Sequence, residues 1–146
     1  MWKQIAFILL ASLVTLSCER RTKVSLRGDS RPIFELSGSG RLGEVIIFGP
    51  EQERIARSDP FDTTYALWDL KPEKEGEAGA AFLEDLHSIT YGVVPRGYVQ
   101  VKPKSGLPQP LTPGNRYRYW FVTVNAPSAS GYFELIDEKP VAVDGP

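Results

Sequence analysis

The side chains that most often carry out chemistry in enzymes are scarce in this chain. It contains one histidine, His87, and one cysteine, Cys18, among 146 residues. A metal site built on several histidines, or a histidine paired with a second one for acid–base work, therefore cannot form. A serine–histidine–aspartate triad would have to use His87, and the sequence has no Gly-x-Ser-x-Gly turn to hold the serine. With Glu84 and Asp85 nearby, His87 would form only a weak cation site, and we expect a solvated helix end instead.

The remaining candidate patterns do not single out a reaction. Residues 37–43 (SGSGRLG) resemble a glycine-rich phosphate loop, but they lack the Gly-Lys-Ser/Thr ending and no helix is predicted after them. Glycosidases place two carboxylates beside one bond, and nothing in the spacing of the 18 acidic residues selects such a pair. We therefore predict a hairpin turn at 37–43, no catalytic residue, no metal site and no cofactor, and we expect that the protein is not an enzyme.

Cys18 stands at the end of an apolar segment that must position it. Lys3 is the only charged residue before it, and residues 5–16 form an apolar stretch that is followed at once by Ser17, Cys18 and Glu19. A positive start, an apolar centre and a small residue at the end are typical of a signal peptide. A membrane-spanning helix needs about 20 apolar residues, so this stretch is too short for a permanent span. We predict that residues 1–17 are a signal peptide and are removed.

Residues 13–18 (LVTLSC) resemble the bacterial lipobox. The resemblance implies that the sulfur of Cys18 receives diacylglycerol, that Cys18 becomes the first mature residue, and that fatty acyl chains such as palmitate anchor the protein. Several acyl chains hold a protein stably on a bilayer, whereas one does not. By resemblance to enteric lipoproteins, Glu19 after the cysteine implies the outer rather than the inner membrane. We expect a lipid-anchored protein of the cell envelope.

Composition indicates one ordinary globular domain behind this anchor. Apolar residues make up 42% of the chain. Without the signal peptide, the chain has 16 basic and 18 acidic residues. Nucleic-acid binding needs a basic excess, and none is visible, so we expect no nucleic-acid partner. With a single cysteine the mature domain has no internal disulfide. We predict a lipidated tether at 18–30 and a folded domain at 31–146.

The folded part reads as a series of short strands. Short apolar runs bounded by turn residues favour strands over helices. Between residues 73 and 87 the pattern changes to helix formers, so we expect a short helix there or a strand beginning near Leu86. We expect a connecting loop at 51–62. The predicted fold class is all-β, an antiparallel Greek-key β-sandwich. The expected strands lie at 24–26, 33–36, 45–48, 64–70, 89–94, 98–101, 116–125 and 132–136.

One segment carries a more specific structural signal. Residues 111–117 (LTPGNRY), followed by alternation and then by residues 131–133 (GYF), resemble the corner and final hairpin of fibronectin type III domains. The resemblance implies a fibronectin type III-like sandwich in which the Tyr117 hydroxyl bonds to backbone upstream, the tyrosine corner. It also implies that Trp68 packs at the centre of the domain.

The strand at 116–125 carries aromatic residues on both faces. Tyr117, Tyr119 and Phe121 alternate with Arg118, Trp120, Val122 and Val124. One face must point into the core, and the other either lies under neighbouring structure or offers a binding stripe. We expect a non-enzymatic module that binds or scaffolds an envelope protein. The alternative is a carbohydrate-binding module that stacks sugars on Trp120 or Tyr98.

Overall fold

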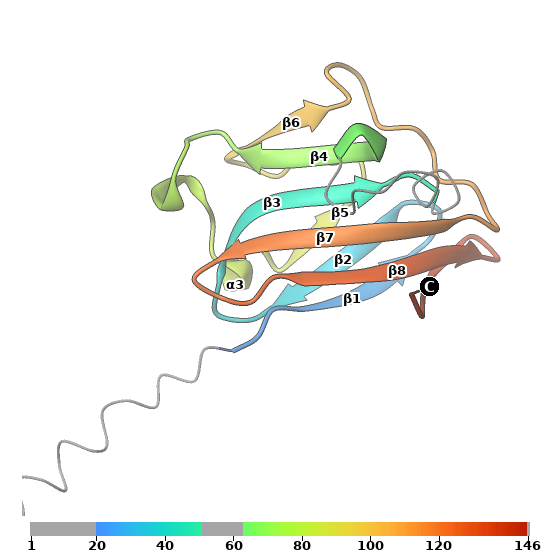
Figure 1. The fold of residues 1–146 in the computed structure, drawn as a ribbon, viewed down its shortest axis with the longest axis horizontal. Coiled ribbons are helices and arrows are strands. Elements are labelled where there is room, and N and C mark those ends of the chain that lie inside the picture. The colour runs from blue at the N-terminus through green and yellow to red at the C-terminus, as the bar shows by residue number, and fades with distance from the viewer. Residues whose placement is uncertain (1–19, 51–62, 146) are drawn as a thin grey trace, which may run out of the picture.

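The chain forms two antiparallel β-sheets that pack face to face, as a computed structural model shows for residues 20–50 and 63–145 (Figure 1). The smaller sheet has the strand order β1-β2-β5, and the larger one has the order β6-β4-β3-β7-β8-β9. The strands are β1 Lys23–Gly28, β2 Pro32–Ser37, β3 Arg41–Phe48, β4 Ala66–Pro72, β5 Ser88–Thr90, β6 Tyr98–Lys102, β7 Arg116–Val124, β8 Ala129–Ile136 and β9 Lys139–Val143. The short helical segments are η1 Thr63–Tyr65, η2 Glu77–Gly79 and α3 Leu83–Leu86. The predicted antiparallel β-sandwich with a short helix is confirmed.

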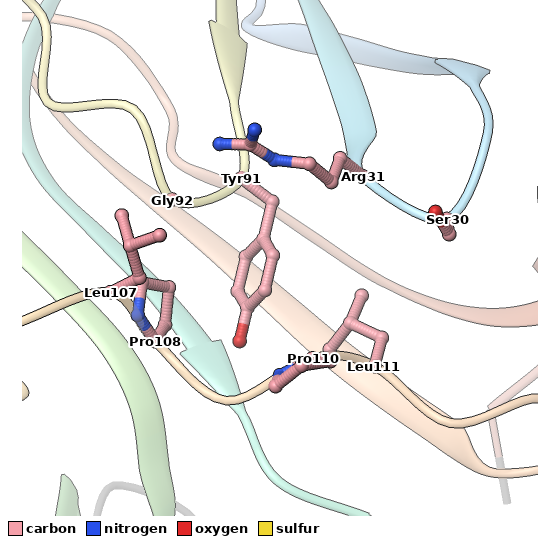
Figure 2. Close-up of a pocket in the computed structure, with 8 residues that line it drawn as sticks. All are labelled: Ser30, Arg31, Tyr91, Gly92, Leu107, Pro108, Pro110 and Leu111. Carbon is pink, nitrogen blue, oxygen red and sulfur yellow. The ribbon is translucent and has the colours of Figure 1, made fainter.

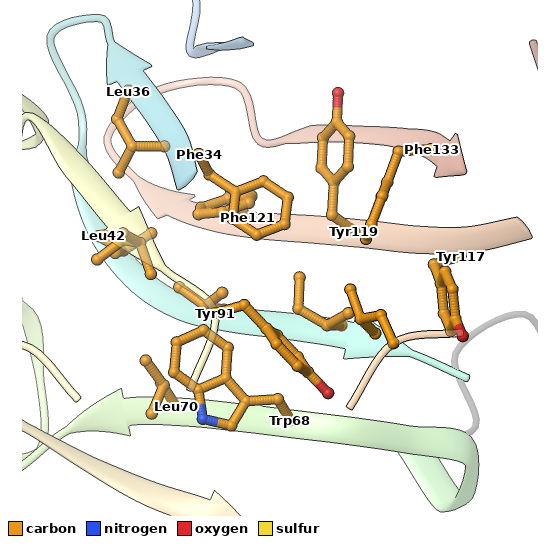
Figure 3. Packing of buried hydrophobic residues seen from close by; sticks show 14 of the residues in the cluster. Phe34, Leu36, Leu42, Trp68, Leu70, Tyr91, Tyr117, Tyr119, Phe121 and Phe133 are labelled. Atoms are coloured by element: carbon orange, nitrogen blue, oxygen red, sulfur yellow. The ribbon is translucent and has the colours of Figure 1, made fainter. Parts of the chain in front are cut away.

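The core lies between the sheets and is built from aromatic rings. Phe34 of β2 contacts the rings of Tyr119, Phe121 and Phe133 at centroid distances of 5.3 to 5.8 Å (Figure 3). Their tilted and edge-on geometries are the favourable ones for aromatic pairs. In β7 the alternation predicted from sequence is confirmed, because Tyr117, Tyr119 and Phe121 are buried while Arg118 and Trp120 are partly exposed. The period-2 pattern thus separates the two faces of β7, and packing against Phe34 shows which of them enters the core.

Tyr117 forms the predicted corner before β7. The backbone amide of Thr112 donates to the Tyr117 hydroxyl oxygen over 2.8 Å, and Tyr117 is only 2% exposed. Gly114, between these residues, adopts a positive φ of 80°, which glycine accepts without strain. Trp68 in β4 is fully buried, as expected. Tyr117 therefore fixes the chain where it enters β7, and Trp68 anchors β4 in the core.

The sandwich begins earlier than predicted. β1 pairs along its whole length with β2, from Lys23 opposite Ser37 to Gly28 opposite Pro32. Before it, Thr22 is buried and its hydroxyl donates to the hydroxyl of Thr123. The predicted domain boundary at residue 31 is therefore wrong, because β1 completes the smaller sheet and belongs to the core.

Other boundaries also differ from the sequence interpretation. The strand expected at 89–94 ends at Thr90, because the chain turns at Gly92, where φ is 78°. The turn at 37–43 is not a hairpin, since β2 and β3 belong to different sheets. β9 was not predicted at all. The expected signal peptide and the expected loop at 51–62 lie outside the described residues. Within the described part of the chain, no helix combines the length and apolar character needed to cross a membrane.

Candidate functional site

The predicted lipidation residue, Cys18, lies just before the described part of the chain. The first described residue, Arg20, accepts a hydrogen bond at its carbonyl from the amide of Ser39 in the β2–β3 turn. β1 begins three residues later, at Lys23. We call this end of the sandwich, formed by Arg20, Lys23 and Ser39, the tether end. Any group attached at Cys18 is separated from the folded core by very little chain.

Tyr98 is not available as a stacking platform for sugars. Its side chain is 6% exposed, and its hydroxyl donates to the Leu42 carbonyl over 2.6 Å. The same hydroxyl accepts a 3.1 Å hydrogen bond from the amide of Ala81. Burial raises the pKa of Tyr98, and the hydrogen bond from Ala81 opposes this effect. The expectation for Tyr98 is therefore wrong: its side chain points into the core and ties β6 to β3.

Trp120 is half-buried on the outer face of the larger sheet. In the strand register it lies beside Ile46 on one side and Ser130 on the other. The guanidinium of Arg118 lies 5.9 Å from the Trp120 ring and 5.5 Å from the ring of Phe48. Ile46 and Phe48 are buried although they belong to this outer face. Trp120 is thus one edge of a partly covered apolar area, and not an open aromatic stripe.

The structure brings together two carboxyl groups that the sequence did not pair. Asp69 of β4 and Glu44 of β3 lie near each other on the outer face of the larger sheet, close enough for their charges to interact. Burial, followed by the charge of Glu44, raises the pKa of Asp69 from 3.8 to about 6, and the charge of Lys71 opposes the shift. Lys71 itself forms a 3.1 Å ion pair with Glu44. Such a pair could in principle supply a proton donor and a base.

This acidic pair is closed to a substrate, however. Asp69 is only 4% exposed, and one of its oxygens, Oδ1, has no hydrogen-bond partner. The amine of Lys102, which lies opposite Asp69 in the register, donates over 2.6 Å to the carbonyl of Thr63. A glycosidase needs its two carboxyl groups on either side of an open cleft. The pair therefore affects the stability of the folded protein, and the raised pKa of Asp69 makes this effect depend on pH.

An open pocket lies at the opposite end of the sandwich from the tether end. It has a volume of about 310 Å³ and is lined by three separate segments, Ser30–Arg31, Tyr91–Gly92 and residues 107–111. In Figure 2 the Tyr91 ring stands between Leu107 and Pro108 on one side and Pro110 and Leu111 on the other. The walls are mostly apolar, and the volume is at the small end of the range for ligand pockets. We call this site the end pocket.

The shape of the end pocket is held by its own internal contacts. The Tyr91 hydroxyl donates to the Gln109 carbonyl over 2.8 Å, which fastens the link between β6 and β7 onto the end of β5. The Tyr91 ring meets Trp68 edge-on at a centroid distance of 5.5 Å. Proline fixes its own φ, so Pro108 and Pro110 add stiffness to the outer wall. The pocket is therefore formed in advance of any ligand.

Arg31 is the charged group at the mouth of the end pocket. Its guanidinium lies across Gly92, where an added Cβ would be 3.5 Å from Nη2 (Figure 2). The nearby Asp29 carboxylate accepts a hydrogen bond from the backbone amide of Arg31. In the part of the chain that the structure describes, the Arg31 side chain has no ion pair or hydrogen bond. Among the described residues, no group therefore competes with an anion for the Arg31 guanidinium at the pocket mouth.

The titratable groups of the end pocket suit binding better than proton transfer. Burial raises the pKa of Tyr91 well above its usual range, with a smaller contribution from nearby Tyr117. The phenol is thus protonated at neutral pH, and an arginine guanidinium is always protonated in water. Among the described lining residues, neither Tyr91 nor Arg31 can serve as a general base near pH 7.

Sequence reasoning missed the end pocket, although it noted part of its wall. The link from residue 103 to 114 stood out as rich in proline and glycine, but only as a connection between strands. Arg31 follows Asp29 and Ser30 in an ordinary turn pattern, and Tyr91 was assigned to the middle of a strand. Nothing in the spacing of these residues along the chain brings them together, because β5 and the link meet only in the folded sandwich.

Comparisons of the chain with protein-family models, with curated proteins and with solved structures found no match in any of the three. The function of the protein is therefore inferred from its residues and their geometry.

Proposed function

We propose that this protein is a lipid-anchored binding module of the bacterial cell envelope, which holds a partner polypeptide in the end pocket. The mature chain would start at lipidated Cys18, on the outer rather than the inner membrane. It would act by binding and not by catalysis. The family resemblances behind this proposal are the lipobox at residues 13–18 and the fibronectin type III-like corner at 111–117.

One observation supports the proposal above the others: the first described residues, which follow the expected anchor, and the end pocket lie at opposite ends of the sandwich. β1 runs from Lys23 at the tether end to Gly28, and Ser30 and Arg31 of the pocket follow directly. A strand of six residues spans about 17 Å. β1 runs from the tether end to the opposite end of the sandwich (Figure 1). A lipid at Cys18 would therefore place the tether end at the bilayer and direct the end pocket away from it. A site in this position is accessible to a partner in the surrounding compartment.

The anchor is tested by the variant Cys18→Ser. We expect the native chain to be extracted from membranes only by detergent, because several acyl chains bind a bilayer stably. Cys18→Ser should be released in soluble form or stay as an uncleaved precursor, which mass spectrometry of the mature terminus distinguishes. If Cys18→Ser is cleaved normally and still requires detergent, the lipid anchor is refuted.

The binding role is tested by photocrosslinking in intact cells. Benzoylphenylalanine is placed at Leu107, which is 73% exposed at the end pocket, or at Ser37, which is exposed at the tether end. We expect a protein adduct at position 107 and a much weaker one at position 37. Equal adducts at both positions, or none at 107, would contradict a partner site at the end pocket. Glycan-array binding that is lost on Trp120→Ala would instead favour the carbohydrate-binding alternative.

A further inference from the structure

The end pocket combines a cation that has no ion-pair partner among the described residues with a small apolar cavity, and this combination restricts the chemistry of its occupant. The Arg31 guanidinium lies at the mouth, while Tyr91, Leu107 and Pro108 form the wall directly below it (Figure 2). A guanidinium presents a planar set of donors that matches the two oxygens of a carboxylate. An occupant that satisfies both parts must carry a carboxylate and an apolar group within a few bonds of each other.

The last residue of a polypeptide has this arrangement. Its free carboxylate and its side chain are attached to the same Cα, so one residue can reach Arg31 and the apolar wall together. An internal aspartate or glutamate also offers a carboxylate, but its chain continues in both directions and its apolar body is short. A cavity of about 310 Å³ accommodates little more than one or two residues. The size and the single charge therefore fit a chain end better than a passing segment.

We infer that the end pocket recognises the carboxyl terminus of its partner polypeptide, with the last side chain apolar. The terminal carboxylate pairs with the guanidinium of Arg31. The last side chain packs on the Tyr91 ring between Leu107 and Pro108. This inference rests on the proposed function and adds the part of the partner that is recognised.

Leu107 supports the inference independently of Arg31. It is the most exposed of the large apolar residues in the described chain, at 73%. Pro108, the next residue, is buried, and Tyr91 behind it is 3% exposed. An apolar side chain seated beside Leu107 would remove part of its surface from water, which favours binding. An occupant is thus bound favourably both by the charge of Arg31 at the pocket mouth and by the apolar surface of Leu107 at the rim.

The test measures binding of the full mature chain, in detergent micelles, to short labelled peptides by fluorescence anisotropy. The probe is glycyl-glycyl-alanyl-leucine with fluorescein at its amino end, compared with the same peptide ending in a carboxamide. We expect the free carboxylate to bind roughly tenfold more tightly, since a hydrogen bond to a charged group at an exposed site is lost with the amide. A peptide ending in lysine should bind more weakly than the leucine peptide.

Two variants and one matched control assign the effect to the pocket. Arg31→Gln should remove the difference between carboxylate and amide, because it removes the charge at the pocket mouth. Leu107→Ser should weaken both peptides by several-fold and keep the difference. Arg96→Gln removes an exposed positive charge outside the end pocket and should leave all affinities unchanged. Both Arg31 and Leu107 are exposed, so neither substitution should prevent folding.

Each contrary outcome has a distinct meaning. Equal binding of the carboxylate and amide peptides, together with a crosslink at position 107, would refute recognition of a chain end and leave the proposed partner site intact. Displacement of the peptide by free 4-methylpentanoate at the same concentration would refute a polypeptide source and indicate a small free acid. If no peptide binds and position 107 gives no adduct, both the inference and the proposed function are wrong.

Discussion

Replacing Asp69 by Asn should stabilise the protein, and the gain should depend on pH. Asp69 is nearly fully buried, and its carboxyl lies next to the carboxylate of Glu44. Burial and this neighbouring charge both disfavour the ionised form, so the pKa rises from 3.8 to about 6. Asparagine has almost the same shape and carries no charge.

The size and sign of the effect follow from the raised pKa. The folded state holds a proton on Asp69 more tightly than the unfolded state, so the native chain loses stability as the pH rises between about 4 and 6. Each unit of pKa corresponds to about 1.4 kcal/mol, which gives a cost of up to about 3 kcal/mol that is complete above about pH 7. As the pH falls below 3.8, the unfolded state also takes up the proton, so Asp69 becomes neutral in both states and the cost disappears.

The assay is urea unfolding of the native chain and of Asp69→Asn from pH 4 to pH 8. The free energy of unfolding should be nearly equal for the two proteins at pH 4, and about 2 to 3 kcal/mol higher for Asp69→Asn at pH 8. Asp144→Asn, at an exposed position near the end of β9, serves as the control and should change stability by less than about 0.5 kcal/mol at every pH. A difference that stays constant with pH, or an Asp69→Asn protein that is less stable at pH 8, would refute this account of the buried pair.

Further predictions concern the hydroxyl groups and the glycine that shape the sandwich. Tyr117→Phe should lower the free energy of unfolding by about 1 kcal/mol, because it removes the hydrogen bond from Thr112; no change in chemical denaturation would argue against the corner. Tyr98→Phe should lower the free energy of unfolding further, by about 2 kcal/mol, because the buried carbonyl of Leu42 loses a hydrogen-bond donor. A smaller decrease than for Tyr117→Phe would contradict this ranking. Gly92→Ala should lower the free energy of unfolding by about 1 to 2 kcal/mol, because φ at this position is 78° and a side chain is strained there. A variant that unfolds at the native midpoint temperature or above it would contradict this strain.

The sequence alone determined the class of fold and the central features of its core. Short apolar runs bounded by turn residues favour strands over helices, and the longest of the expected strands, at 116–125, follows the two-residue alternation of a sheet. The alternation of β7 and the role of Tyr117 followed from this local periodicity and from a turn pattern only a few residues long, whereas the sequence left open which face of β7 points into the core. Such features are readable because neighbouring residues alone decide them.

The tertiary structure decided which residues share a site. Tyr98 was a predicted stacking platform for sugars, yet its hydroxyl reaches the carbonyl of Leu42, which is 56 residues away in the chain. The sequence predicted a tether at 18–30 that includes a short strand at 24–26, and pairing with β2 places this strand, β1, in the sandwich.

The end pocket shows the same limit most clearly. Arg31 lies in the bend between β1 and β2, and Leu107 lies in the link between β6 and β7. Their role at one site appears only when the folded strands bring these two segments together. Side-chain alternation is a property of a few consecutive residues, whereas a binding site depends on contacts between segments far apart in the chain. The local pattern therefore predicts a sandwich, and only the packing of its connections defines what that sandwich can hold.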